Sequence, residues 1–246
     1  MDEKISKLKN LLKRAEEEDP EDIKSEAKDF LKNMDETDLM VAEQGLIDDG
    51  MKPSDMRHLC TAHLELMREQ WGSNPTNGLP SSHPVKVLMQ EHEQILSLLE
   101  KLEKASSSVN TKGNSGTLDT SRENVRAIAE SLLSAENHHL REEKALFPEL
   151  EQRGLSGPPE IMRMEHETLR TMKHDLLDLT SEKDDLVFKK ELSRLSADLI
   201  FMLRDHIFKE DNVLYPSAID LIKNEEEWDS ITQTCDKIGY CPFLVK

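Results

Sequence analysis

Two segments of the chain repeat a pattern of residues that can hold a metal ion. Both read His, Glu at +4, Leu at +8, an aromatic residue at +9 and Pro at +10, starting from His138 and from His206. Positions i and i+4 lie on one helix face, so His138 with Glu142 and His206 with Glu210 each present a nitrogen and an oxygen to one region. A lone His-x-x-x-Glu is usually a solvated helix face, but its repetition favours metal ligation.

Two further histidines, His92 and His166, each lie between two glutamates. They belong to the first and third of four expected helices, over 83–105, 121–152, 158–182 and 184–223. The second and fourth carry the repeated pattern. Because neighbouring helices run antiparallel and rise about 1.5 Å per residue, counting from the helix ends places all four histidines in one layer. Residues 105–121, rich in Ser and Gly, are expected to form a long loop.

The donor set indicates which metal fits. Imidazoles and carboxylates together suit iron, with zinc or manganese as substitutes, and no thiolate lies near the layer. One zinc ion takes about four ligands, so six or more suggest two ions, with Glu142 and Glu210 as natural bridges. Without a metal, these groups would carry a severe desolvation cost in the core.

The His-x-x-x-Glu-x-x-x-Leu-aromatic-Pro pairs resemble those of hemerythrin-like, His-His-Glu cation-binding domains, over residues 83–223. The resemblance implies an up-down-up-down antiparallel four-helix bundle with two iron ions, bridged by carboxylates and an oxo or hydroxo group. It implies binding of, or response to, oxygen, nitric oxide or peroxide. The ligands carried over are His92, His138, Glu142, His166, His206 and Glu210.

The third helix departs from the oxygen-carrying hemerythrins, because Met162 and Arg170 stand four residues either side of His166. His139 is the first candidate for the missing ligand, against a plain surface histidine. His83 is weaker, since a role at the helix start competes with ligation. We expect Glu143 to face solvent.

The missing ligand on the third helix favours a sensor or binding protein over an oxygen carrier. The alternative is an enzyme that reduces nitric oxide or peroxide, or an iron-donating repair protein.

Composition limits the function. The 246 residues carry a formal net charge of −18, which argues against nucleic acids and anionic membranes as partners. Aromatic residues make up only 4%, and helix formers dominate, so the protein should be all-α. No segment is long and apolar enough to span a membrane, and no signal peptide is evident, so a cytoplasmic location is expected.

The chain divides into a helical domain over 1–75, a linker over 76–82, the bundle over 83–223 and a tail over 224–246. Residues 45–63 resemble a helical domain of unknown function that often precedes hemerythrin-like domains, and the tail resembles the end of that arrangement. The first domain could meet a protein partner or form a homodimer.

The chain has three cysteines, too few for a disulfide framework. Cys60 with His63, and Cys235 with Cys241, are weak candidates for small metal or redox sites, against ordinary packing.

Overall fold

A computed structural model describes residues 76, 78–111 and 115–243, with the isolated positions 6, 7, 10 and 14. These residues form helices and no strand, which confirms the all-α prediction. Apart from those four positions and residue 76, everything before residue 78 lies outside the described residues. The expectations for the first domain, and for Cys60 with His63, fall there. No helix among the described residues is long and apolar enough to cross a membrane.

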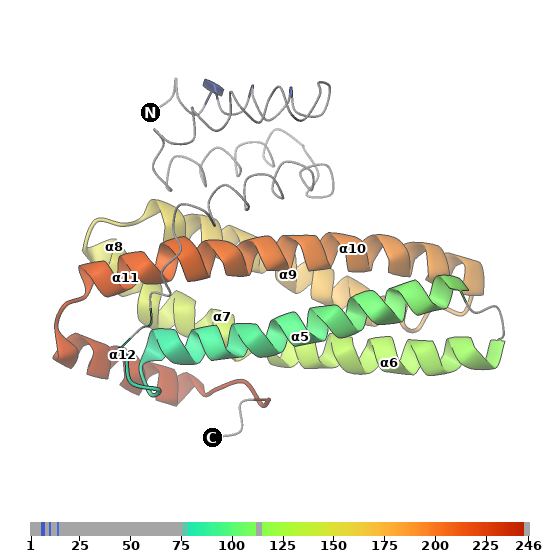
Figure 1. The fold of residues 1–246 in the computed structure, drawn as a ribbon, viewed down its shortest axis with the longest axis horizontal. Helices are drawn as coiled ribbons and strands as arrows, with labels where there is room; N and C mark the ends of the chain where they lie inside the picture. Colours follow the sequence, from blue (N-terminus) through green and yellow to red (C-terminus); the bar gives the residue numbers. More distant parts are fainter. Residues whose placement is uncertain are drawn as a thin grey trace.

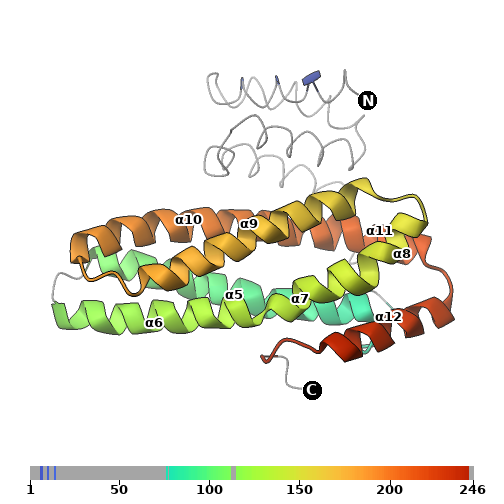
Figure 2. The same ribbon diagram turned by 180° about the vertical axis from the view of Figure 1, so that it is seen from behind.

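Four antiparallel helical rods form the bundle, as predicted (Figure 1). The first is α5, Pro84–Thr111, and the third is α9, Gly157–Leu179. The second is built from α6, α7 and α8, and the fourth from α10 and α11. Their bounds are Ser115–Ser134, Glu136–Arg141, Phe147–Gln152, Asp185–Lys209 and Tyr215–Leu221. A final helix, α12, Glu225–Ile238, packs against α5 and α7 at one end of the bundle (Figure 2).

The expected long loop over 105–121 is wrong, because α5 runs on to Thr111 and α6 begins at Ser115. The serines in this stretch do not break the helix, since Ala105 and Val109 continue its buried face. Ser108 Oγ also donates to the Ala105 carbonyl at 2.8 Å, which satisfies the hydroxyl locally. Apolar periodicity therefore outweighs the polar composition here.

Each repeated motif contains one turn of π-helix. The turns are η1, Glu142–Leu146, and η2, Glu210–Leu214, and each begins at the glutamate of its motif. The Phe147 N–H donates to the Glu142 carbonyl five residues back, and Tyr215 repeats this with Glu210. The following prolines lack an N–H and crowd the preceding turn, which accounts for the wider turn at this point. The bulge therefore follows from the aromatic-Pro pair in the sequence.

The hydrophobic core has two parts. One contains Leu99, Leu132 and Leu169, and the other contains Leu88, Phe147 and Leu214. Buried polar side chains, including His92, His138, His166 and His206, lie on the four rods that also carry these clusters. A polar layer inside a bundle is costly unless its groups are paired or bind a cation.

Candidate metal centre

All six residues of the predicted ligand set are buried. Each of the four histidines and two glutamates is at most 2% exposed. They come from all four rods of the bundle, and their side chains converge in one region. The structure thus brings the whole predicted set together, while its role in ligation stays a prediction.

The outer nitrogen of each histidine is held by a carboxylate. In every case Nδ1 donates to one carboxylate oxygen, so in the neutral ring the lone pair is on Nε2, which faces the centre. The four pairs are His92 with Asp211 at 2.8 Å, His138 with Glu91 at 2.8 Å, His166 with Glu143 at 2.7 Å, and His206 with Glu165 at 2.7 Å.

The inner nitrogens surround the two glutamates. Glu210 Oε1 lies 2.9 Å from His206 Nε2, and Glu210 Oε2 lies 3.1 Å from His92 Nε2. Glu142 Oε2 lies 3.4 Å from His138 Nε2 and 3.5 Å from His166 Nε2. Each glutamate therefore stands between histidines of different rods, as a bridging ligand would.

Several of these inner atoms have no hydrogen-bond partner: His166 Nε2, His206 Nε2, Glu142 Oε2 and both oxygens of Glu210. In addition, His92 Nε2 and His138 Nε2 lie 3.0 Å apart, so two lone pairs oppose each other when both rings are neutral. A cation relieves both problems, since it accepts lone pairs that nothing else satisfies. The residues present therefore fit a metal centre.

In the absence of a metal, protons compensate the same charges. Burial by itself would lower the pKa of His92, but Asp211 and Glu210 raise it to about 10. Burial likewise opposes the effect of Glu210 and Glu165 on His206, whose pKa rises to about 9. Burial raises the pKa of Glu142 well above its usual value, with the charge of Glu210 adding to the effect. The centre thus attracts positive charge, and metal ions compete with protons for it.

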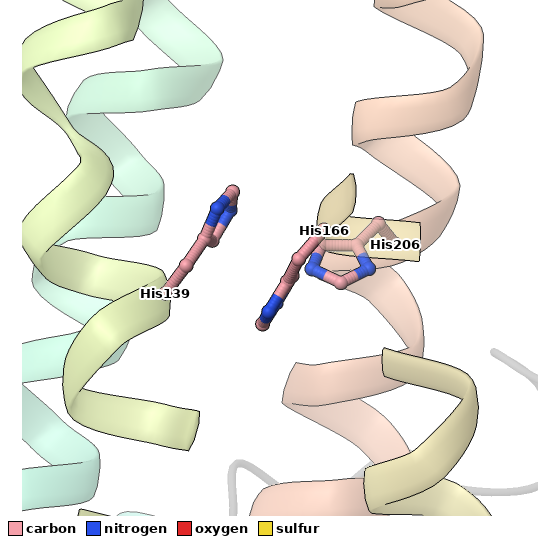
Figure 3. A group of neighbouring side chains, drawn as sticks. All are labelled: His139, His166 and His206. Carbon is pink, nitrogen blue, oxygen red and sulfur yellow. The ribbon is translucent and has the colours of Figure 1, made fainter. Parts of the chain in front are cut away.

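The candidate ligand atoms fall into two groups joined by a third. One group is His92, His138 and Glu210, another is His139, His166 and His206, and Glu142, His166 and Glu210 link them. His139 projects from α7 toward the other two histidines of its group (Figure 3). Its ring stacks on His166 with centroids 4.0 Å apart. His139 is 2% exposed, so the surface-histidine alternative is wrong.

The other weak candidate, His83, does not join these groups. Its carbonyl accepts the Val87 N–H at the start of α5, at 3.0 Å. Its ring lies against Trp228 of α12, with centroids 4.3 Å apart. The described contacts therefore place His83 at the helix start, packed under α12.

Three of the four carboxylates behind the histidines are themselves held by cations. Arg141 donates to Glu91, and Lys209 donates to Glu165. Arg170 donates to Glu143 at 2.8 Å, so the expectation that Glu143 faces solvent is wrong. The sequence did carry a signal for these residues. A glutamate precedes both His92 and His166, and both repeats place an acidic residue directly after the glutamate that is the candidate ligand.

The segment after the bundle reaches this layer of anchors. The Cys241 N–H donates to Glu91 Oε1 at 3.1 Å, and the Arg141 guanidinium stacks over Tyr240 at 4.8 Å. Cys235 and Cys241 are buried free thiols. Burial raises the pKa of Cys235 to about 11 and that of Cys241 to about 12, which disfavours the reactive thiolate. These contacts favour packing over a redox role for the two cysteines.

Comparisons with known proteins agree with this geometry. Residues 83–218 match the family model described as the hemerythrin HHE cation binding domain, and residues 8–72 match a family of unknown function, DUF438. The chain is also similar to the iron-sulfur cluster repair protein YtfE of Escherichia coli O157:H7, with 34% identity over 91 residues. YtfE of Shigella boydii serotype 18 matches equally. The match covers 34% of this chain and 41% of each relative, less than half of their length.

Proposed function

The chain belongs to the hemerythrin HHE cation-binding family, and we propose that it holds two iron ions in the bundle. The observation that carries the proposal is the set of inward Nε2 and carboxylate atoms without partners. Glu210 offers one oxygen to each group of histidines, which favours two ions over one. The proposed ligands are His92, His138, Glu142, His166, His206 and Glu210, with His139 as the seventh.

A pair of iron ions would supply reversible electron transfer and open coordination positions for oxygen, nitric oxide or peroxide. The residues of this chain determine what can reach them. His139 adds a nitrogen donor beside His166 and His206, whereas the His92 and His138 group lacks a third histidine among the described residues. We therefore propose that the small ligand binds on the His92 side, and that the protein acts as a sensor or binding protein.

A second candidate is iron donation during repair of iron-sulfur clusters, which the printed name of the YtfE relatives supports. Under either function we propose a cytoplasmic location, where Cys235 and Cys241 stay reduced. We also propose that the first 75 residues bind a protein partner or a second copy of the chain. The two candidates differ in the fate of the metal. A sensor keeps its iron when oxygen or nitric oxide binds, whereas a donor loses iron to a cluster-free iron-sulfur protein.

Metal analysis with an absorption spectrum tests the shared proposal. We expect about two irons per chain and a charge-transfer band that changes with oxygen. Replacing His206 or Glu142 with alanine should lower the iron content, while His174→Ala, at an exposed position of α9, should not. A colourless protein that retains only zinc, or full iron content in both ligand variants, would contradict the proposal.

The two candidate functions are separated by one transfer experiment. The iron-loaded protein is mixed with a cluster-free ferredoxin, cysteine and sulfide, and cluster assembly is followed by absorption. Iron that moves to the ferredoxin supports repair. Iron that stays bound, with a spectrum that shifts reversibly under nitric oxide, supports sensing.

A further inference from the structure

The bundle has two halves, residues 84–152 and 157–221, whose side chains correspond at matching positions. In the first half, His138 of the motif is anchored by Glu91, and Arg141 donates to Glu91. In the second half, His206 is anchored by Glu165, and Lys209 donates to Glu165. Each cation lies three residues after the histidine of its motif. The remaining histidine of each half is anchored by an acidic residue of the opposite half. Positions that differ between the halves therefore stand out, because they make two otherwise equivalent metal positions unequal.

One such difference is at position +9 of the motif, where Phe147 corresponds to Tyr215. Both rings are fully buried, and each stacks on a histidine of the opposite half. Phe147 stacks on His166 with centroids 5.9 Å apart, and Tyr215 stacks on His92 at 5.6 Å. The two aromatic residues occupy equivalent places, and only one of them has a hydroxyl.

That hydroxyl donates to Glu142 Oε1 at 2.7 Å. The matching carboxylate, Glu210, has no such hydroxyl donor, because a phenylalanine, Phe147, occupies the equivalent place, and both oxygens of Glu210 face histidines. Glu142 is therefore left with one oxygen, Oε2, directed at the histidines, whereas Glu210 has two. A carboxylate oxygen that accepts a hydrogen bond from a neutral phenol also has less electron density to give a cation.

We infer that Tyr215 is a positioning residue that restricts Glu142 to ligation through one oxygen and thereby sets how readily the centre releases iron. The inference rests on the proposed iron centre and deepens it. Glu142 is then the weaker carboxylate of the pair, and it limits how tightly the centre holds iron. An alternative explanation of the contact is that a buried tyrosine simply needs an acceptor for its hydroxyl.

The two halves offer a matched test. Tyr215→Phe removes the hydroxyl and keeps the stacked ring, and Phe147→Tyr places a hydroxyl at the equivalent position, facing Glu210. Each protein is loaded with ferrous iron without oxygen, and release to an excess of a coloured ferrous chelator is timed. Tyr215→Phe should release iron about fivefold more slowly, the ratio that one hydrogen bond of ordinary net strength corresponds to. Phe147→Tyr should release it faster, and the double variant should return toward the wild-type rate.

Mössbauer spectra of the loaded proteins provide a readout that a packing role would not move. Two distinct iron environments in the wild type should become more alike in Tyr215→Phe. Equal release rates and equal spectra in wild type and Tyr215→Phe, at full iron content, would overturn the inference and leave the iron centre standing. A wild-type chain that takes up no iron would overturn both. If Tyr215→Phe loses its helical circular dichroism, Phe147→Tyr decides the question, since an unchanged release rate there also overturns the inference.

Discussion

Glu91 anchors one side of the metal centre, and its replacement by glutamine tests the network around it. Glu91 is fully buried and accepts hydrogen bonds from His138 Nδ1, from Arg141 and from the Cys241 N–H. Glutamine keeps the shape but removes the negative charge. Arg141, only 1% exposed, would then carry a buried charge without its anion.

The size of the effect follows in two ways. Breaking a buried ion pair by removing one partner costs about 3 to 5 kcal/mol of unfolding free energy. Burial by itself would raise the pKa of Glu91, but the hydrogen bond from His138 and the charge of Arg141 lower it from 4.5 to about 2. A shift of that size corresponds to about 3 kcal/mol of preference for the charged form in the folded state. The two values agree, so we expect a loss of about 3 kcal/mol at pH 7.

Urea unfolding of the metal-free protein at pH 7, followed by circular dichroism, measures this loss. Glu93→Gln is the matched control, because Glu93 lies two residues away on the same helix and is exposed. It should change stability by less than about 0.5 kcal/mol. Iron affinity of Glu91→Gln should also fall, by about 10- to 100-fold, since His138 loses its anchor. Equal unfolding curves for the two variants would refute the reasoning.

Two further predictions concern the anchor from the C-terminal segment and a buried charge. Cys241→Pro removes the N–H that donates to Glu91 and should lower the thermal midpoint and iron retention, whereas Cys241→Ala keeps the N–H and should change little. Lys173 is 2% exposed and corresponds to Leu99 in the first half. Burial lowers the pKa of Lys173 from 10.5 to about 8. Because the unfolded chain binds this proton more tightly, Lys173→Leu should stabilise the protein by up to about 3 kcal/mol below pH 8, and the gain should shrink as pH rises toward 10.5. Unfolding curves at pH 7 and pH 10 check it, and a gain that does not depend on pH would contradict it.

The layer of four histidines could be placed from the sequence because helix rise is fixed and the motif repeats. His92 and His138 could be set at one height by counting residues, with no knowledge of side-chain contacts. The loop over 105–121 was predicted from composition instead and is wrong, since Ser108 and its neighbours are polar but lie on a helix whose other face is buried. Local composition is weaker information than periodicity over several turns.

The anchors behind the ligands were harder to predict. Glu143 follows the proposed ligand Glu142 and was expected in solvent, yet it accepts hydrogen bonds from His166 Nδ1 and from Arg170. Its orientation depends on the π-helical turn that begins at Glu142, which a regular helical wheel does not contain. Contacts such as that of Cys241 with Glu91 join residues 150 positions apart, and no local pattern indicates them.

Each half supplies a carboxylate that anchors a histidine of the other half, and this has a consequence for how the protein takes up metal ions. Asp211 of the second half anchors His92 of the first, and Glu143 of the first half anchors His166 of the second. Glu210 likewise faces histidines of both halves. Neither helix pair contains a complete set of ligands and anchors, so occupancy of one position fixes groups that the other position needs. If two ions bind as proposed, such sharing favours all-or-none loading, in which empty and doubly filled molecules outnumber those with one ion.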